Sequence, residues 1–289
     1  MKNTILKFTG AVLMVTAFIS CNKDKVDPVV EEILEIPSCK VTSWKSEEFY
    51  LGTSTWTDLS TITYNADGYP DKITDDSGWS ITFVYSGGKL SKLVESDGVD
   101  SYENTYEWNG DKITKYVGSY VFEAVTYTDE YRYEYNVDKV SKIANWDNYS
   151  GTVMGEMVEY SYEEFTWTGE NVTKTAYFLN DFSGGRVEFI KKKKKRKFLN
   201  SGRTEGFVED GTSVYTYDDK LNPFQFFGYI WGEAGLMGKN NMLSSTYTDG
   251  TGTYSYSSTY EYNAENFPTK KTEIDGDYTY VDTYTYDCN

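Results

Sequence analysis

Aromatic and apolar residues alternate with polar ones along most of the chain, and short runs of turn-forming residues interrupt this alternation at similar spacings. Several aromatic pairs with one residue between them lead into runs such as "SGGK", "NGDK" and "NVDK". Alternation with a period of two is typical of a β-strand that buries one face. Glycine and asparagine suit the tight turns that join antiparallel strands. Each unit therefore predicts a β-hairpin.

Aligning these units on the second aromatic residue gives a set that we call the repeat aromatics: Tyr64, Tyr85, Trp108, Tyr135, Trp167, Tyr217, Tyr262 and Tyr286. Five positions later, six units carry an apolar or aromatic residue, namely Tyr69, Leu90, Ile113, Val140, Val172 and Phe267. In a hairpin that folds symmetrically about its turn, these two positions are cross-strand partners. We therefore expect them to share one face of the sheet.

Four units also place a lysine two positions after the apolar residue, at Lys92, Lys115, Lys142 and Lys174. Simple alternation predicts that these lysines share the face of the repeat aromatics. Each methylene stem would then lie along a neighbouring ring while the ammonium group reaches water. A cation–π contact with that ring is the alternative.

A hairpin with one apolar face cannot bury that face alone, so the units must pack together. Two strands per unit give on the order of fourteen to sixteen strands, more than an open twisted sheet usually holds. The expected fold is all-β, with antiparallel β-hairpin repeats curled into a large barrel-like or spiral β-sheet. A split into two packed sheets is the alternative, and helix signals are nearly absent after residue 37.

Composition narrows the function classes. The chain has 28 Tyr, 15 Phe and 7 Trp, a net charge of −17 and no histidine. The negative charge argues against nucleic acid as a partner, and the lack of histidine excludes Ser-His-Asp and Cys-His catalysis. The mean hydropathy of −0.59 and the polar second face of the hairpins predict a soluble rather than a membrane-spanning domain.

The N-terminus has the pattern of a secretory signal. Lys2 and Lys7 precede an apolar run at 11–19 and the small residue Ser20, which predicts a signal peptide at 1–20. The sequence "FISC" resembles a bacterial lipobox. That resemblance implies cleavage before Cys21 and acylation (palmitate or a similar chain) of this cysteine; the alternative is an ordinary cleaved signal. Residues 21–37 read as a polar tether, and 38–289 as the β-hairpin repeat domain.

Four longer stretches carry a family resemblance: "ITYNADGYPDKIT", "YTYDDKLNPF", "GKNN" and "YEYNAENFPTKKT". Together they resemble uncharacterised bacteroidete lipoproteins whose domain of unknown function is described as porin-like in fold. The resemblance covers about 38–289. The motifs are also distantly similar to the tyrosine–aspartate (YD, RHS-like) repeats of secreted bacterial proteins. Neither family supplies a catalytic residue, so the resemblance implies fold and location only.

Location follows from the same N-terminal signals. Asn22 after the cysteine, by resemblance to Gram-negative sorting rules, points to an outer membrane lipoprotein. Whether it faces the periplasm or the cell surface stays open. In that oxidising compartment Cys39 and Cys288 are expected to form a disulfide between the two ends of the domain, the alternative being two free thiols.

The basic run Lys191–Lys197 stands out in this acidic chain. It has three interpretations: a binding site for an anionic polymer or lipid headgroups, a solvated loop, or a local shift of the reading frame. Acidic clusters at Asp75–Asp76, Asp218–Asp219 and 273–277 lack the spacing of known calcium loops, so no metal or cofactor is predicted.

Tyr229 and Trp231, in the glycine-rich stretch "GYIWGEAGLMG", are the candidates for a ligand-binding rim, since exposed rings stack on sugars. Packing of an insertion onto the shell is the alternative. The expected function is a non-enzymatic, lipid-anchored binding or structural module of the cell envelope, with a carbohydrate or protein partner. The alternatives are a surface glycan-binding lipoprotein and a hydrolase with two carboxylates, for which no pair stands out.

Overall fold

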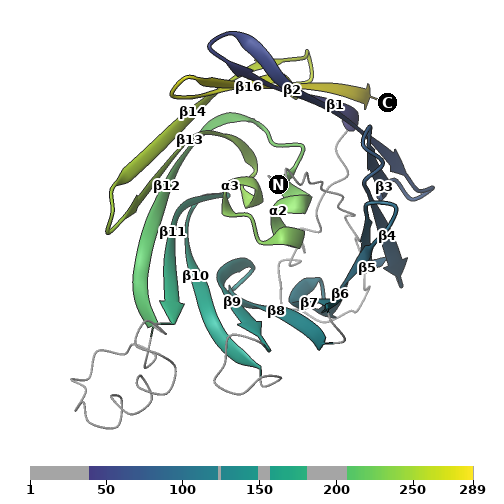
Figure 1. Ribbon diagram of the computed structural model, residues 1–289, viewed down its shortest axis with the longest axis vertical. Helices are drawn as coiled ribbons and strands as arrows, with labels where there is room; N and C mark the ends of the chain where they lie inside the picture. Colours follow the sequence, from purple (N-terminus) through teal and green to yellow (C-terminus); the bar gives the residue numbers. More distant parts are fainter. Residues whose placement is uncertain (1–38, 123–124, 149–156, 181–206, 289) are drawn as a thin grey trace, which may run out of the picture.

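The protein forms a closed antiparallel β-barrel (Figure 1). The computed structural model describes residues 39–122, 125–148, 157–180 and 207–288. These residues form sixteen strands, each paired with its neighbour in the chain, and the first strand pairs with the last. The all-β, barrel-like prediction is therefore confirmed, and the spiral and two-sheet alternatives are excluded.

The strands and helices have the following bounds: β1 Cys39–Tyr50, β2 Thr53–Tyr64, β3 Pro70–Asp75, β4 Ser80–Ser86, β5 Lys89–Ser96, β6 Ser101–Asn109, β7 Lys112–Phe122, β8 Val125–Asn136, β9 Lys139–Asp147, β10 Val158–Thr168, β11 Asn171–Asn180, β12 Phe207–Leu221, α2 Gln225–Trp231, α3 Ala234–Met237, β13 Asn240–Asp249, β14 Thr253–Tyr262, β15 Pro268–Asp275 and β16 Tyr278–Cys288.

Each strand directs one set of side chains into the barrel and the other set outward. In β8, Tyr131, Tyr133 and Tyr135 belong to the core, whereas Arg132 and Glu134 between them are exposed. Because side chains alternate along a strand, this pattern makes the inner face aromatic and the outer face polar. The core therefore lies inside the barrel.

The repeat aromatics bind the backbone of the preceding strand pair. Trp108 Nε1 donates to the Leu90 carbonyl at 2.7 Å, and the Tyr135 hydroxyl donates to the Ile113 carbonyl at 2.9 Å. The same contact recurs from Tyr64 to Val41, Tyr85 to Pro70, Trp167 to Val140, Tyr217 to Val172 and Tyr286 to Pro268. Seven of the eight repeat aromatics thus join one hairpin to the next through the backbone, whereas the Tyr262 hydroxyl donates to the Asp218 carboxylate.

The cross-strand pairing of the repeat aromatics agrees with the sequence in four units: Tyr85–Leu90, Trp108–Ile113, Tyr135–Val140 and Trp167–Val172. In two other units the partners of the aromatic are Pro70 and Pro268 instead. Both have a longer turn, closed by an asparagine side chain: Asn65 Oδ1 accepts from the Tyr69 amide at 3.0 Å, and Asn263 Oδ1 accepts from the Phe267 amide at 2.8 Å.

The expectation that Lys92, Lys115, Lys142 and Lys174 share the face of the repeat aromatics is wrong. A β-bulge lies next to each repeat aromatic, for example between Glu107 and Trp108. A bulge adds one residue to a strand and so shifts the alternation. Lys115 therefore lies opposite Glu107 on the outer face, with 2.6 Å between Nζ and Oε1.

A second set of lysines, each at the first position of a strand directly after a turn, does meet the repeat aromatics. The Nζ atoms of Lys89, Lys112 and Lys139 lie 5.8, 5.4 and 5.3 Å from the ring centroids of Trp108, Tyr135 and Trp167. Each ammonium group also donates to a carbonyl in the next turn of the same end, at Gly110, Val137 and Gly169 respectively. These lysines link consecutive turns around the rim.

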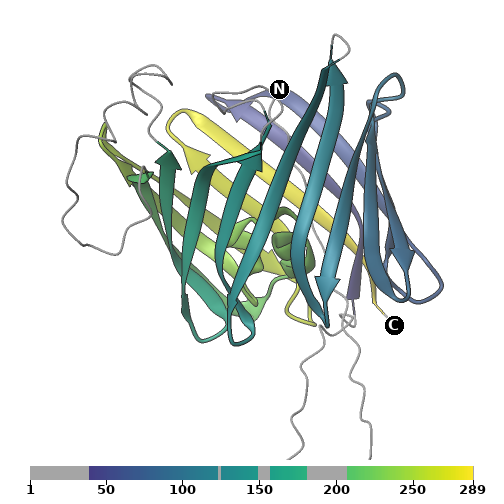
Figure 2. The same cartoon turned by 90° about the horizontal axis from the view of Figure 1, so that it is seen from below.

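Helices α2 and α3 lie inside the barrel, in the connection between β12 and β13 (Figures 1 and 2). The sequence did not predict these two helices, which are seven and four residues long. Phe227, Ile230 and Met237 are completely buried. We call the segment 222–239 the plug. No helix among the described residues is long and apolar enough to cross a membrane.

Hydrogen bonds fix the plug both internally and to the barrel wall. Asn222 donates from Nδ2 to the carbonyls of Leu236 and Gly238 at 2.9 and 3.0 Å. The last carbonyls of a helix have no hydrogen-bond partner within the helix. In α2 the partners are tyrosines of the barrel wall: the hydroxyls of Tyr106 and Tyr133 donate to the carbonyls of Ile230 and Tyr229 at 3.3 and 3.0 Å. The plug is thus hydrogen-bonded to the barrel wall.

The two ends of the barrel differ. The end that carries the plug connection, called the plug end, also holds the turns at 65–69, 87–88, 110–111, 137–138, 169–170 and 263–267 and both Cys39 and Cys288. The opposite end, called the cavity end, holds the turns at 51–52, 76–79, 97–100, 250–252 and 276–277.

Candidate ligand-binding site

A cavity of about 720 Å³ lies inside the barrel against the plug. Its lining residues come from β10 to β14 and from the segment that joins the two helices. They are Ser161, Tyr162, Glu163, Tyr177, Phe178, Leu179, Asp210, Ser213, Tyr215, Trp231, Gly232, Glu233, Ala234, Gly235, Met242, Ser245, Tyr247 and Tyr256. Cavities of this volume hold small molecules in many proteins.

The floor of the cavity is formed by the plug from Trp231 to Gly235. The Trp231 ring stacks on Phe227, with 5.1 Å between ring centroids and 7° between planes. Gly232 ends α2 with a φ of 69°, a left-handed conformation that favours glycine. The chain turns at Gly232 after α2, and the fully buried Phe227 packs against the Trp231 ring.

The wall carries a network of hydroxyl groups. The Tyr177 hydroxyl lies 3.2 Å from both Ser213 Oγ and the Tyr215 hydroxyl. On the neighbouring strand, Asn145 donates from Nδ2 to Ser161 Oγ at 3.0 Å. Burial raises the pKa of the Tyr177 hydroxyl, so this group stays protonated and can donate as well as accept.

Three carboxyl groups line the cavity, from Glu163 in β10, Asp210 in β12 and Glu233 in the plug. Burial raises the pKa of Glu163 to about 7, because a low-dielectric surrounding disfavours the charged form. No lysine or arginine is among the lining residues. Near neutral pH the site therefore holds a carboxyl group that is poised between its two protonation states.

The structure separates the two residues predicted to form a ligand-binding rim. Both lie in α2 within the lumen, not in a rim loop. Trp231 lines the cavity. Tyr229 lies against Trp167, with 6.5 Å between ring centroids, and is not among the lining residues.

The other side of the lumen, near β2, β15 and β16, has a separate polar network. Burial and a hydrogen bond with Asp76 raise the pKa of Asp58 to about 6. Lys271 lies 2.8 Å from Glu273, and Ser46 donates to Asp282 at 2.6 Å. These carboxyl, ammonium and hydroxyl groups therefore have hydrogen-bond or ion-pair partners within the barrel wall.

The acidic clusters noted in the sequence have structural partners. Asp218 accepts hydrogen bonds from the Asn241 amide at 3.0 Å and from the Tyr262 hydroxyl. Asp75 Oδ1 accepts from the Ser77 and Trp79 amides at 2.9 and 2.8 Å and so closes the turn between β3 and β4. These carboxylates fix turns and strand ends.

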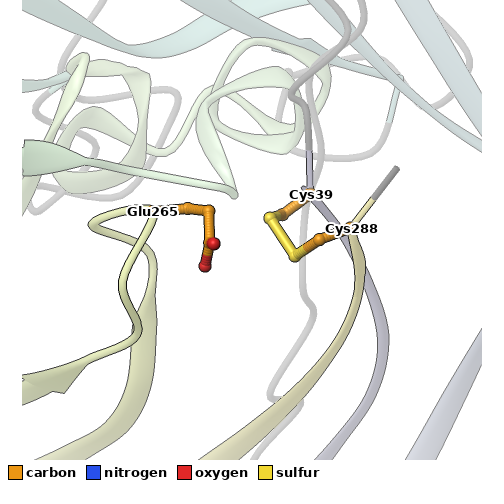
Figure 3. Close-up of side chains that lie close together, drawn as sticks. All are labelled: Cys39, Glu265 and Cys288. Carbon is orange, nitrogen blue, oxygen red and sulfur yellow. A yellow bond between two sulfur atoms is a disulfide. The ribbon is translucent and has the colours of Figure 1, made fainter.

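Cys39 and Cys288 are joined by a disulfide between β1 and β16 (Figure 3). The Glu265 carboxylate lies beside it, and this trio is the metal-like grouping found within the part of the chain that the structure describes. Zinc and similar metals bind the thiolate form of cysteine. The bonded sulfurs offer no thiolate, so we assign no metal to this group.

Two predicted features lie outside the described residues: Cys21, with the signal peptide and tether, and the basic run Lys191–Lys197. Sequence reasoning missed Glu163, although a signal was present. It lies on the inward face of β10 between Ser161 and Phe165, so it is a charged residue at a position that alternation assigns to the core.

Comparisons with known proteins concern the fold alone. No protein-family model and no curated protein matches the chain. The chain is structurally similar to a porin-like protein from Bacteroides uniformis ATCC 8492, with 13% identity, 86% of this chain and 96% of that chain covered, and a TM-score of 0.49. A porin-like protein from Bacteroides vulgatus ATCC 8482 has 13% identity, coverage of 86% and 98%, and a TM-score of 0.38. The comparisons give no support for a relation to tyrosine–aspartate repeats.

Proposed function

We propose that this protein is a non-enzymatic, lipid-anchored binding protein of the Gram-negative envelope that holds a small molecule inside a water-surrounded barrel. The observation that carries the proposal is the cavity of about 720 Å³, floored by the plug and lined by tyrosine, serine and carboxyl groups. Such a combination of rings and convergent polar groups is typical of small-molecule sites.

The outer face of the barrel supports a soluble domain. A membrane-spanning barrel needs an outward apolar band about 25 Å tall. Here the outward positions form polar ladders across neighbouring strands: Thr216 with Ser244 at 2.6 Å, Thr246 with Ser255 at 2.9 Å, and Thr248 with Thr253 at 3.1 Å. Threonine and serine hydroxyls on this face are suited to contact with water.

Exposed apolar residues do occur on the outer face, and threonines flank some of them along their strands. Leu59 lies between Thr57 and Thr61, and Val214 lies between Thr212 and Thr216. The buried apolar core is on the inside, where the plug fills part of the lumen. This arrangement suits binding within the barrel better than conduction through it.

Attachment to the membrane is supported by the sequence, through the lipobox-like "FISC" and the predicted acylation of Cys21. Two or more acyl chains on one cysteine are sufficient to hold a soluble domain at a membrane surface.

A binding screen tests the proposal. Soluble protein carrying residues 22–289 is titrated with a panel of small ring-bearing compounds, including neutral sugars, and binding is followed by thermal shift and calorimetry. Replacing Trp231 by alanine removes the floor of the cavity, so we expect binding to weaken at least tenfold. Trp56→Ala serves as the matched control, because Trp56 is exposed and lies in β2 away from the cavity. Equal effects of both substitutions, or no binding by any compound, would contradict the proposal.

Glycan binding is a second candidate, and the position of Trp231 favours it. Flat apolar sugar faces stack on tryptophan while hydroxyl groups of the wall accept and donate hydrogen bonds. Retention of the protein on polysaccharide columns, lost in Trp231→Ala, would support this candidate over a smaller ligand.

A hydrolase remains the alternative class, and the raised pKa of Glu163 is the observation that favours it. A general acid works best with a pKa near the working pH. Hydrolysis of chromogenic glycosides that disappears in Glu163→Gln would overturn the non-enzymatic proposal.

A further inference from the structure

We infer that the cavity selects small organic cations, meaning amines or quaternary ammonium ions with an aromatic or short aliphatic body. The inference rests on the proposed binding function and adds the chemical class of the ligand. It stands on the charge of the lining and on its ring content.

The lining is charged with one sign only. Glu163, Asp210 and Glu233 approach the cavity from three separate elements, and no lysine or arginine lines it. The chain as a whole carries a net charge of −17, so the long-range field also attracts cations. An anionic ligand would find no counter-charge in this cavity.

Seven aromatic residues line the same space: Tyr162, Tyr177, Phe178, Tyr215, Trp231, Tyr247 and Tyr256. The faces of such rings attract cations, and groups of rings bind quaternary ammonium ions in other proteins. The rings also bury the apolar body of a ligand, which a bare metal ion would not need. The mixture therefore favours an organic cation over an inorganic one.

The protonation of Glu163 makes the binding of a cation depend on pH. Its pKa of about 7 means that a cation must displace the proton at lower pH. The groups that face it are Tyr131 and Tyr133 from β8 and Tyr177 from β11. Their pKa values are raised by burial, so they stay neutral between pH 5 and 8, and Glu163 is the group among them that titrates in this range.

The test uses three probes of matched shape and different charge. Tyramine is the cation, 4-ethylphenol the neutral analogue and 3-(4-hydroxyphenyl)propionate the anion; benzyltrimethylammonium is a second cation. Calorimetry at pH 5.5 and pH 8 measures the affinity of each for the soluble protein of residues 22–289. We expect both cations to bind at least tenfold more tightly than the neutral analogue at pH 8, and at least fivefold more weakly at pH 5.5 than at pH 8.

The variant Glu163→Gln should remove most of this pH dependence and weaken tyramine binding about tenfold at pH 8. Glu164→Gln is the matched control, because Glu164 is the next residue in β10 and is exposed on the outer face; it should bind tyramine as the unchanged protein does. Circular dichroism and thermal unfolding establish that both variants are folded.

The outcomes separate this inference from the function on which it rests. If 4-ethylphenol binds as tightly as tyramine, with loss in Trp231→Ala, the cavity binds ligands but the preference for cations is wrong. Tighter binding of the anion would also overturn it. If no probe binds at any pH, and the wider panel fails as well, the proposed function falls together with the inference.

Discussion

Glu163 shows how one residue can make the stability of the whole barrel depend on pH. It is a carboxyl group on an inward face, and its pKa of about 7 is caused by burial. The unfolded chain binds a proton at this side chain only below its ordinary value of 4.5. The folded state therefore binds more protons than the unfolded state between pH 4.5 and 7.

The sign of the effect follows from this difference. Stability contributed by neutral Glu163 is complete below pH 4.5 and is lost as the pH rises to 7. The loss is on the order of 3 kcal/mol, from a shift of about two pKa units or slightly more. We predict that Glu163→Gln unfolds at the same denaturant concentration as the unchanged protein at pH 4.5 and at a higher one at pH 8.

Urea titrations at pH 4.5 and pH 8 measure the unfolding midpoints and so test this prediction, with Glu164→Gln as the exposed control. Asp58 titrates in a similar range, but it is present in every variant and cancels in the comparison. A Glu163→Gln protein that is less stable than its parent at pH 8 would show that the carboxylate is paired in the folded state.

The sequence identified the repeat aromatics but not what their polar tips contact. Alternation shows that Trp108 and Tyr135 face the core; it does not show that each reaches a carbonyl of the preceding strand pair. That contact depends on the stagger between hairpins, which no single hairpin encodes. Glu163 was missed because 45 acidic residues make any one of them inconspicuous until the inner face is known.

At the scale of elements, the close packing of α2 against α3 holds the plug together. Gly228 lies where the two helices meet, and a Cβ built there would come within 2.4 Å of the Leu236 carbonyl carbon and the Met237 amide nitrogen. Backbone atoms at this distance cannot move aside without shifting a helix. The glycine therefore permits the approach that places the floor of the cavity.

We predict that Gly228→Ala destabilises the protein by about 1–3 kcal/mol, the usual cost of overpacking a core. Gly250→Ala is the matched control, since its Cβ would meet nothing within 4 Å in the turn between β13 and β14. Thermal and urea unfolding measure both variants. A neutral Gly228→Ala would mean that the helices can separate freely, so that the cavity floor is not fixed as described.

The strands were predictable because their signal is local, whereas the plug and the bulges were not. The segment around Phe227 and Gly228 reads as a glycine-rich aromatic loop, and its helices are seven and four residues long. Helices this short are stabilised by tertiary packing and carry little signal of their own. Likewise, the bulge between Glu107 and Trp108 cannot be seen in a pattern that assumes strict alternation, and this misplaced Lys115.

At the scale of the whole molecule, the contact between β1 and β16 closes the barrel. It runs from Cys39 opposite Cys288 to Tyr50 opposite Tyr278, and the disulfide joins residues separated by 249 positions. Closing so long a loop restricts the unfolded chain, which in the loop-entropy model contributes about 5 kcal/mol.

We predict that reduction lowers the thermal unfolding midpoint by several degrees while the strand content of the folded state is unchanged, because the β1–β16 ladder remains. Thermal scans with and without dithiothreitol measure this effect. A Cys39→Ser/Cys288→Ser variant should unfold where the reduced protein does and be insensitive to the reagent. If reduction leaves the midpoint of the unchanged protein where it was, the bridge does not stabilise this barrel.

Cys39, the first residue that the structure describes, lies at the plug end, whereas Leu179 and Asp210 place the cavity toward the other end. Under the proposed acylation of Cys21, the domain would be attached to its membrane from the plug end. A bilayer attached through Cys21 would therefore lie beneath the floored side of the molecule. Solutes from the surrounding medium would then reach the cavity end without first crossing the lipid surface.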